Sequence, residues 1–363
     1  MSKYWSKLAL SLEPYVPGEQ LKDKKYIKLN TNENPYPPSP KVIEAIKTAA
    51  NDSLKLYPDP TGEDLKCVLA KYYGLNKNQV FLGNGSDEVL AFSFMAFFNP
   101  DESILFPDIT YSFYPVYSNI FKINYEAIPL SEDFSLPLEQ FFNSKGGVII
   151  PNPNAPTARA ISLKNIEEIL KKNKEKVVII DEAYVDFGAE SVVGLVDKYP
   201  NLLVIQTLSK SRSLAGLRVG YAFGHEELIE GLTRVKDSIN SYTLDRLALA
   251  GAVAAIKDDE YFQLTRKKII DTRKSVVSRL EKLGFKVVPS RANFIFISHA
   301  KVKAEEIFLK LKQESVLVRY FKKPRIDNYL RVSIGNDEEM DSLIKALKQV
   351  LNSDGDSFSP SEF

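Results

Sequence analysis

The chain has 363 residues, 44% of them hydrophobic, and its 48 lysine and arginine residues nearly balance its 47 aspartate and glutamate residues. This length favours one large domain accompanied by a smaller one. The net charge of +1 gives no electrostatic basis for binding nucleic acid or an acidic membrane surface. The single cysteine, Cys67, excludes an internal disulfide, and with only two histidines, His225 and His299, it leaves no ligand set for a structural zinc. We expect these three side chains to be structural and the protein to bind no metal.

The sequence carries no recognisable membrane or secretion signal. No apolar run approaches the roughly 20 residues that a membrane-spanning helix needs. The first residues, from Met1 to Trp5, lack the apolar core of a signal peptide. The sequence therefore predicts a cytoplasmic protein.

Three helices and an extended loop are predicted in the first part of the chain. Helices are expected over residues 40–50, 62–73 and 86–98, the last of them directly after the turn Gly83-Asn84-Gly85. The segment from Pro35 to Pro40 is rich in proline and can form neither a helix nor an inner strand. We expect it to be an extended loop.

Three apolar, β-branched runs in the middle of the chain are typical of buried parallel strands. They cover residues 147–150, 177–180 and 202–205, and each is bounded by polar or turn residues. Between the first two, residues 162–173 carry apolar side chains at helical spacing, and Ser162 can cap this helix. The alternation predicts an α/β domain with a mostly parallel sheet flanked by helices.

The character of the chain changes near residue 260. A long charged helix is expected over residues 260–283, followed by strands over 285–288 and 293–297, a helix, two more strands and a closing helix. This order indicates a smaller α+β domain with its own core. We therefore divide the chain into an N-terminal segment that packs with the small domain (1–29), a large domain (30–260), a small C-terminal domain (261–351) and a tail predicted to be disordered (352–363).

Polar residues gather where the predicted strands end, which is where open α/β sheets bind their ligands. Asp181 to Tyr184 follow one strand, and Thr207 to Lys210 follow the next, with Arg218 shortly after. The turn at residues 83–85 opens a helix whose free N–H groups suit a phosphate. Pyridoxal phosphate needs a lysine for a covalent link, an acid opposite its ring nitrogen, and cations and amides for its phosphate. The set therefore indicates this cofactor.

Several motifs in a fixed order carry a family resemblance over about residues 8 to 351. They are Tyr15-Val16-Pro17-Gly18, Leu29-Asn30-Thr31-Asn32-Glu33-Asn34-Pro35, Tyr57-Pro58-Asp59-Pro60, Gly83-Asn84-Gly85-Ser86-Asp87-Glu88, Asp181-Glu182-Ala183-Tyr184-Val185-Asp186-Phe187, Thr207-Leu208-Ser209-Lys210, Ala215-Gly216-Leu217-Arg218-Val219-Gly220-Tyr221 and Leu330-Arg331-Val332-Ser333-Ile334-Gly335. In this order they resemble the fold-type I pyridoxal-phosphate-dependent aminotransferases, and within them the histidinol-phosphate aminotransferases. The resemblance implies that residues 30–260 form the cofactor-binding domain.

The resemblance implies catalytic roles for matching residues. Lys210 is expected to link covalently to pyridoxal 5'-phosphate and then to move a proton between the substrate Cα and the cofactor. Asp181 is expected to pair with the pyridine nitrogen, and Tyr184 to hydrogen-bond the ring oxygen O3′. Tyr111 is expected to stack on the face of the ring.

Further residues are implied for the phosphate and the substrates. The phosphate cradle is expected to consist of Gly85, Ser86, Asp87, Thr207, Ser209 and Arg218. Tyr57 is similar to the tyrosine that reaches a cofactor phosphate in the neighbouring subunit, so the resemblance implies a homodimer. The substrate residues implied are Tyr15, Asn32, Arg319 and Arg331, with Arg331 gripping a carboxylate or a phosphate.

One motif departs from the family pattern. The family commonly has Asn-Pro-Thr-Gly after the first of the three strands, and its asparagine bonds O3′, whereas this chain reads Ala155-Pro156-Thr157-Ala158. Either Asn154 supplies that hydrogen bond from one position earlier, or Tyr184 carries O3′ alone. A hydrogen bond to a charged acceptor contributes about 1.5–3 kcal/mol. We assign the role to Asn154.

The activity implied is reversible transfer of an amino group between histidinol phosphate and 2-oxoglutarate. Threonine-phosphate decarboxylases share the fold and most of these motifs, and the pocket for imidazole could admit a phenyl ring, so decarboxylation and aromatic amino-acid transamination are the alternatives. Aminotransferase-like sensor domains of transcription regulators carry an added DNA-binding module before the fold. Here the motifs begin near residue 15, which disfavours that function.

Overall fold

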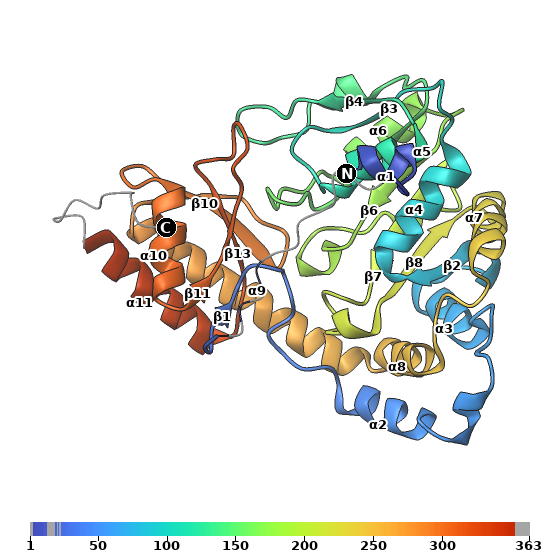
Figure 1. The fold of residues 1–363 in the computed structure, drawn as a ribbon, viewed down its shortest axis with the longest axis horizontal. Helices are drawn as coiled ribbons and strands as arrows, with labels where there is room; N and C mark the ends of the chain where they lie inside the picture. The colour runs from blue at the N-terminus through green and yellow to red at the C-terminus, as the bar shows by residue number, and fades with distance from the viewer. Residues whose placement is uncertain (1–2, 13–18, 20, 22, 353–363) are drawn as a thin grey trace.

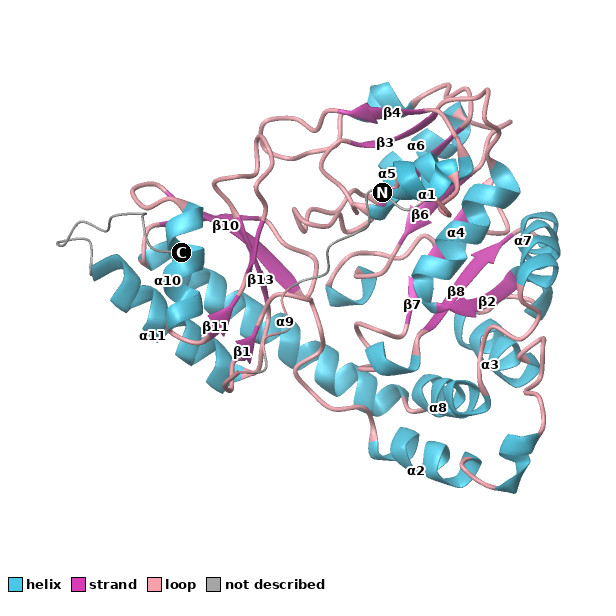
Figure 2. Cartoon of the chain, viewed as in Figure 1, coloured by secondary structure: helices cyan, strands magenta, loops and turns pink. Residues whose placement is uncertain are grey.

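The larger of two lobes in this computed structural model is built on a seven-stranded sheet (Figures 1 and 2). The structure describes residues 3–12, 19, 21 and 23–352. The strand order is β2-β8-β7-β6-β5-β3-β4, and β8 alone runs antiparallel to its two neighbours in this sheet. The strands are β2 (Val80–Asn84), β3 (Ile104–Pro107), β4 (Tyr125–Ile128), β5 (Gly147–Pro151), β6 (Val178–Asp181), β7 (Leu202–Thr207) and β8 (Val219–Gly224). The predicted mostly parallel sheet is confirmed.

Helices cover both faces of this sheet. They are α2 (Pro40–Ala49), α3 (Glu63–Tyr73), α4 (Gly85–Phe97), α5 (Phe113–Phe121), α6 (Leu163–Lys172), α7 (Glu226–Ile239) and α8 (Arg246–Lys257). The buried side chains of α2, α3, α6 and α8 form one apolar cluster with the sheet, and those of α4, α5 and α7 form another. Short 3-10 helices lie in the connections: η1 (Asp52–Lys55), η2 (Lys77–Gln79), η3 (Leu138–Phe141), η4 (Val185–Phe187), η5 (Val193–Leu195) and η6 (Ala215–Leu217).

The pleat of β6 decides which way its last residue faces. Val178 and Ile180 belong to the cluster on the α2, α3, α6 and α8 side, whereas Ile179 belongs to the cluster on the other side. Because side chains alternate along a strand, Asp181 faces the same side as Ile179. That side holds Tyr114 of α5. A continuous apolar strand therefore delivers one carboxyl group to the carboxyl edge of the sheet.

The smaller lobe contains an antiparallel sheet with the order β12-β13-β10-β9. Its strands are β9 (Phe285–Val288), β10 (Phe294–His299), β12 (Arg319–Tyr320) and β13 (Leu330–Ser333), and its helices are α9 (Asp259–Lys282), α10 (Ala304–Gln313) and α11 (Asp337–Asn352). Residues of these elements share one buried apolar cluster. In Figure 1, α9 extends from the larger lobe into the smaller one.

An early segment of the chain joins the smaller lobe. Strand β1 (Ile27–Lys28) pairs in parallel with β11 (Val316–Leu317), and Leu29 is buried in the cluster of that lobe. Three strands lie after α10, where the sequence predicted two, because the run from Val316 to Tyr320 divides between partners. Its first half pairs with β1 and its second half, β12, pairs with β13.

The ends of the chain are described only in part. Helix α1 (Lys7–Ser11) has no buried side chain. Tyr15 and residues 353–363 of the predicted tail lie outside the described residues. Among the residues that are described, no helix combines the length and the apolar character needed to cross a bilayer.

Candidate active site

A cavity lies where the carboxyl ends of β5, β6 and β7 meet the smaller lobe. Its walls come from the segment before α2, the start of α4, the strand ends, and the paired strands β12 and β13. The lining residues are Asn30, Thr31, Asn32, Ser86, Asp87, Tyr111, Pro151, Ala155, Asp181, Ala183, Tyr184, Thr207, Ser209, Lys210, Arg218, Arg319 and Arg331. The structure thus brings together most of the residues that the sequence singled out.

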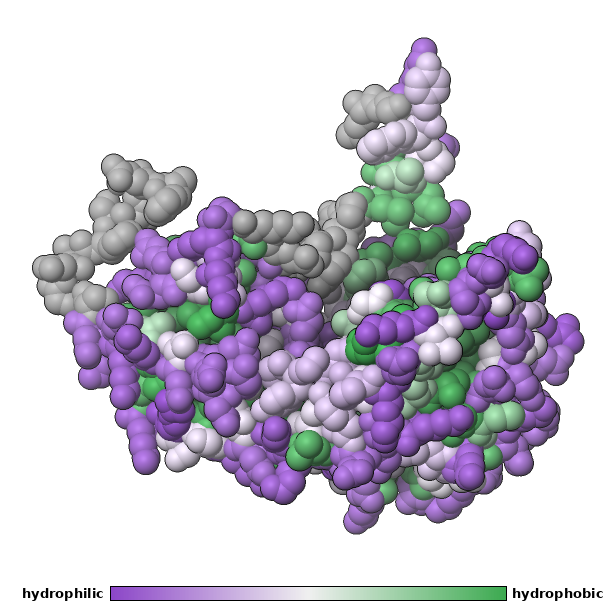
Figure 3. All heavy atoms as spheres, turned by 90° about the horizontal axis from the view of Figure 1, so that it is seen from below, coloured by the Kyte–Doolittle hydropathy of each residue, from purple (hydrophilic) through white to green (hydrophobic). Residues whose placement is uncertain are grey.

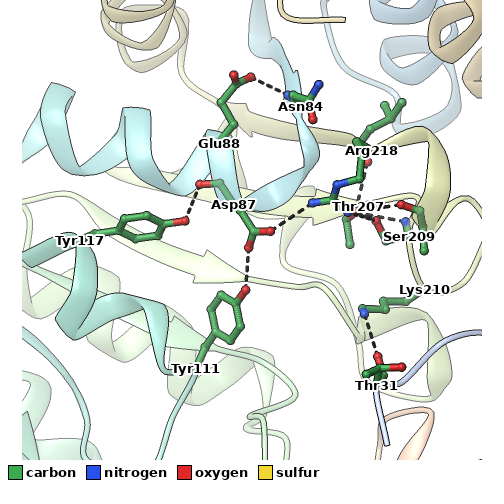
Figure 4. A network of polar contacts seen from close by, with 12 residues as sticks. Thr31, Asn84, Asp87, Glu88, Tyr111, Tyr117, Thr207, Ser209, Lys210 and Arg218 are labelled. Carbon is green, nitrogen blue, oxygen red and sulfur yellow. Dashed lines mark hydrogen bonds and ion pairs between the residues drawn. The ribbon is translucent and has the colours of Figure 1, made fainter. Parts of the chain in front are cut away.

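Lys210 follows β7 and is held at its backbone as well as at its side chain. The side-chain amide of Asn34 donates to the carbonyl oxygens of Lys210 and Ser211, at 3.0 and 3.2 Å. The ammonium group of Lys210 donates to the carbonyl oxygen of Thr31 at 3.4 Å (Figure 4). The lysine Nζ is therefore directed into the cavity from a fixed peptide.

Asp181 lies at the floor of the cavity, almost completely buried. One carboxylate oxygen accepts from the Tyr114 hydroxyl at 2.9 Å and the other from the backbone N–H of Ala183 at 3.2 Å. Burial outweighs these two hydrogen bonds and raises the pKa of Asp181 to about 6. A carboxyl group in this setting favours a cationic partner, because pairing offsets the cost of removing its charge from water.

Tyr184 places a hydroxyl beside the lysine. The side-chain amide of Asn32 donates to the Tyr184 hydroxyl oxygen at 3.1 Å. Nζ of Lys210 lies 5.8 Å from the centre of the tyrosine ring. The ring packs edge-on against Phe294 of the smaller lobe.

A group of donors surrounds the start of α4, as Figure 4 shows. Arg218 forms an ion pair with Asp87 at 3.1 Å and donates to the Ser209 hydroxyl at 3.4 Å, and the Thr207 hydroxyl donates to Ser209 at 3.0 Å. Gly85 has a φ of +77°, and a Cβ there would overlap the Arg218 guanidinium. The Arg218 guanidinium, the nearby hydroxyls and the N-terminus of α4 together form a site that suits an oxyanion, called here the oxyanion cradle. Its geometry depends on the absence of a side chain at Gly85.

Tyr111 forms one wall beside this cradle. Its hydroxyl donates to Asp87 at 2.6 Å, and its ring packs edge-on against Tyr114. Burial and the nearby Asp87 raise the pKa of Tyr111 well above its usual value, so the hydroxyl remains a donor. Asp87 is therefore bridged between Tyr111 and Arg218.

Two arginines face each other on the opposite wall. Arg319 of β12 and Arg331 of β13 are direct cross-strand partners. A terminal nitrogen of Arg331 donates to the carbonyl oxygen of Asn30 at 2.9 Å, and the guanidinium lies over the rings of Phe294 and Phe321. Like charges side by side at a cavity wall favour an anionic ligand, and guanidinium groups bind carboxylates and phosphates with two parallel hydrogen bonds.

Comparison with known proteins identifies the family. The pattern described as aminotransferase class I and II matches residues 24–347. The chain belongs to this family. It is 63% identical over 351 residues to a histidinol-phosphate aminotransferase of Clostridium acetobutylicum, covering 97% of this chain and all of the relative. It is 60% identical to a histidinol-phosphate aminotransferase of Clostridium botulinum strain Langeland, over 97% of this chain and 99% of the relative.

Solved structures of the family share the fold. The histidinol-phosphate aminotransferase of Sinorhizobium meliloti, solved in complex with pyridoxal-5'-phosphate, superposes with a TM-score of 0.88 at 24% identity, over 97% of this chain and 99% of that one. A solved histidinol-phosphate aminotransferase from Clostridium acetobutylicum, a different protein from the 63% identical relative, gives a TM-score of 0.83 at 25% identity, over 90% of this chain and 99% of that one. The predicted fold-type I aminotransferase fold is confirmed, and family membership confirms the expected cofactor and enzyme class.

The residues of the cavity fit pyridoxal phosphate. Asp181, buried and lacking a cationic partner among the described residues, suits the protonated ring nitrogen, and the oxyanion cradle suits the phosphate. Lys210 Nζ can reach an aldehyde between these two anchors. At Gly85, a Cβ would overlap the Arg218 guanidinium, so this guanidinium can lie so close to the start of α4 only because the residue is glycine.

Among the described residues, three predicted site residues are not part of the cavity lining: Gly85, which lies beside Arg218 at the start of α4, Tyr57 and Asn154. Tyr15 lies outside the described residues. Tyr57 is 78% exposed and stacks on Tyr242, with ring centres 4.6 Å apart. Asn154 donates its amide to the Ile109 carbonyl and the Thr157 hydroxyl, both at 2.9 Å, and its buried Oδ1 has no partner among the described residues. The geometry therefore favours the alternative in which Tyr184 alone serves the ring oxygen.

Some residues at the site were not predicted. Tyr114 of α5 donates a hydrogen bond to Asp181, and its place three residues after the predicted Tyr111 was a usable signal. Asn34, Asn30 and Thr31 touch Lys210 or Arg331 from an irregular segment. They lie within the quoted motif around residues 29–35, but nothing in an irregular segment reveals which way each side chain points.

Proposed function

We propose that this protein transfers an amino group from histidinol phosphate to 2-oxoglutarate, forming imidazole acetol phosphate and glutamate in histidine biosynthesis. The observation that carries the proposal is the 63% identity to a histidinol-phosphate aminotransferase over nearly the whole chain. The cavity adds the chemical support, because it holds a lysine, a buried acid, an oxyanion cradle and a second anion-binding wall. The cytoplasm is the proposed location.

Each residue of the site has a defined task in this reaction. Bound pyridoxal phosphate supplies an electrophilic carbon and an electron-withdrawing ring. Asp181 keeps the ring nitrogen protonated, because a buried carboxylate without a cation beside it is costly. Lys210 would hold the cofactor through its Nζ, and the same Nζ, when free, would act as the general base that removes the proton at the substrate Cα. Tyr184 donates a hydrogen bond to the ring oxygen.

The paired arginines account for two unlike substrates in one pocket. Histidinol phosphate ends in a phosphate, and the carbon chain of glutamate ends in a carboxylate. The Arg319 and Arg331 guanidinium groups can bind either oxyanion, while the rings of Phe294 and Phe321 lie against Arg331 and limit its movement. Substrate choice therefore rests on the space between this wall and Lys210.

The protein is proposed to act as a homodimer. Tyr57 does not line the cavity of its own chain, and its exposed ring stacks on the ring of Tyr242. Leu54, Leu56 and Ile239, close to this pair in sequence, are also more than half exposed. In Figure 3, α1 stands away from the body and carries hydrophobic residues in green. Exposed apolar surface of this kind is typical of a protein interface, and a partner's Tyr57 would complete the phosphate cradle.

Separate incubation of the cofactor-loaded protein with histidinol phosphate, threonine phosphate or phenylalanine tests the proposal. With histidinol phosphate we expect the cofactor absorbance to change to that of its amine form, and addition of 2-oxoglutarate to restore it and produce glutamate. Carbon dioxide released from threonine phosphate would indicate the decarboxylase instead. Faster turnover of phenylalanine than of histidinol phosphate would indicate an aromatic aminotransferase. The Lys210→Ala variant is the control and is expected to give no turnover.

A further inference from the structure

Position 155 lacks a group that could bind the cofactor's ring oxygen. Ala155 lines the cavity beside Tyr184, and its methyl group can neither donate nor accept a hydrogen bond. Asn154 is directed elsewhere, with both amide hydrogens donated to Ile109 and Thr157. The Tyr184 hydroxyl is therefore the side-chain donor to the ring oxygen in the proposed function. It can donate only if its single proton points toward that oxygen.

Asn32 is fixed more firmly than a residue that only lines a pocket. It is 1% exposed and adopts a φ of +56°. Its backbone N–H donates to the Ser333 hydroxyl at 2.8 Å, and its carbonyl oxygen accepts from the Asn293 side chain at 3.0 Å. Its Oδ1 accepts from the Ser333 hydroxyl at 3.1 Å, and its Nδ2 donates to Tyr184. All four polar groups of Asn32 are thus in use.

These bonds set the direction of the tyrosine proton. A serine hydroxyl has one proton, and Ser333 gives it to Asn32 Oδ1, so the NH₂ end of the Asn32 amide must face Tyr184. Turning the amide over would leave that serine proton without its acceptor. Because the Tyr184 oxygen accepts from Asn32, its own proton is left to point elsewhere. Since Tyr184 lines the cavity, this proton is available to a ligand bound there.

We propose that Asn32 is a positioning residue that holds Tyr184 as a hydrogen-bond donor toward the ring oxygen of the cofactor, and so compensates for Ala155. This inference rests on the proposed function. The family resemblance implies that Asn32 contacts the substrate. In the present proposal Asn32 acts instead by orienting the Tyr184 hydroxyl.

The same contacts connect Tyr184 to the substrate wall. Ser333 lies two residues after Arg331 on β13. Arg331 also donates to the carbonyl oxygen of Asn30, two residues before Asn32. A shift of β13 when an anion binds Arg331 would therefore reach the Tyr184 hydroxyl through Asn32.

The test is the pH at which the absorbance of the bound cofactor changes in the absence of substrate. A donor to the ring oxygen stabilises its negative charge and lowers this midpoint, so losing it raises the midpoint. Asn32→Gly removes the side chain without straining the positive φ. We expect it to raise the midpoint by about one pH unit, roughly tenfold in proton affinity. In the Tyr184→Phe background, Asn32→Gly should add no further shift.

Two further variants keep this result interpretable. Ser333→Ala should raise the midpoint in the same direction by a smaller amount, and it is the substitute if Asn32→Gly does not fold. Asn201→Ala removes another buried asparagine, one that donates to three carbonyls at the end of α6 and in the segment before β6, and it should leave the midpoint unchanged.

The inference is overturned if Asn32→Gly leaves the midpoint at the wild-type value, or if its shift adds fully to that of Tyr184→Phe. An absent cofactor absorbance in the wild-type protein would instead contradict the proposed function.

Discussion

Asp181 and Glu182 are consecutive, buried carboxyl groups with different surroundings. Asp181 faces Tyr114 in the cavity floor. Glu182 accepts hydrogen bonds from Ser191, from the backbone N–H of Val192 and from Gln206, at 2.6, 2.7 and 2.8 Å. Burial nevertheless raises the pKa of Glu182 to about 7, since the three donors offset only part of the lost hydration. One carboxyl serves the cofactor, and the other joins the loop before η5 to β7.

The raised pKa of Glu182 predicts a loss of stability with rising pH. In the unfolded chain a glutamate ionises near its ordinary pKa of 4.5, whereas the folded protein retains the proton up to about pH 7. The folded state binds more protons in this window, so the free energy of unfolding falls as pH rises from 4.5 to 7 by about 3 kcal/mol and then levels off. Buried Asp181, whose pKa is raised to about 6, adds a decline of its own at lower pH. Glu182→Gln should therefore remove only the part of the decline that Glu182 contributes, measured by urea unfolding of variant and wild type at several pH values.

The comparison needs a control for the lost charge. Glu175 is exposed, so Glu175→Gln removes one negative charge from the surface. A difference between Glu182→Gln and wild type that stays constant from pH 4.5 to 7 would contradict the assignment.

Single residues differ in how well the sequence predicts their place. Lys210, Asp181 and Arg218 follow apolar strands or a recognisable turn, so their meeting at one sheet edge could be expected. Asn154 could not be placed in this way. Its amide donates to the carbonyl oxygen of Ile109, 45 residues earlier in the chain, and no local sequence pattern predicts such a contact.

At the scale of elements, the start of α4 is the most constrained part of the site. Gly85 occupies a left-handed conformation with the Arg218 guanidinium against it. Gly85→Ala would strain the backbone and push that guanidinium from the phosphate cradle. We expect this substitution to weaken binding of pyridoxal phosphate by at least about tenfold. An absorbance titration of cofactor-free protein measures the change.

The matched control is Gly194→Ala, where an added Cβ meets no atom within 4 Å. It should bind the cofactor as the wild type does. Equal affinity for the Gly85→Ala and Gly194→Ala variants would show that the cradle tolerates a side chain.

Elements with a strong period were predicted close to their observed bounds. β5, β6 and β7 are continuous apolar runs, and α6 carries its cap at Ser162 as expected. β8 was not predicted, because two of its six residues are glycines and it contains no long β-branched run. The segment at residues 30–34 has no regular period, so its contacts with the site depend on tertiary structure that only the coordinates reveal.

At the scale of the whole molecule, the two lobes contribute different halves of the site. The larger lobe supplies Lys210, Asp181 and the phosphate cradle, whereas the smaller lobe supplies Arg319 and Arg331. Segment 27–34 belongs to both, since β1 pairs with β11 while Asn34 holds the peptide of Lys210. Catalysis therefore depends on how the lobes meet.

The proposed homodimer predicts complementation between two inactive variants. Lys210→Ala lacks the general base, and Tyr57→Ala lacks the residue offered to the partner. When the two are unfolded, mixed and refolded, half of the dimers should contain one chain of each kind. One site of each such dimer is intact, so about a quarter of wild-type activity should return. Activity no higher than that of the separate variants would contradict an exchange of Tyr57 between subunits.

The central claim of this account is a covalent link between Nζ of Lys210 and the aldehyde carbon of pyridoxal phosphate. Reduction of the cofactor-loaded protein with borohydride makes this link permanent, and mass spectrometry of its peptides locates it. The account predicts the added mass on Lys210 and on no other lysine. A label on a different lysine, or cofactor bound without any label, would contradict it.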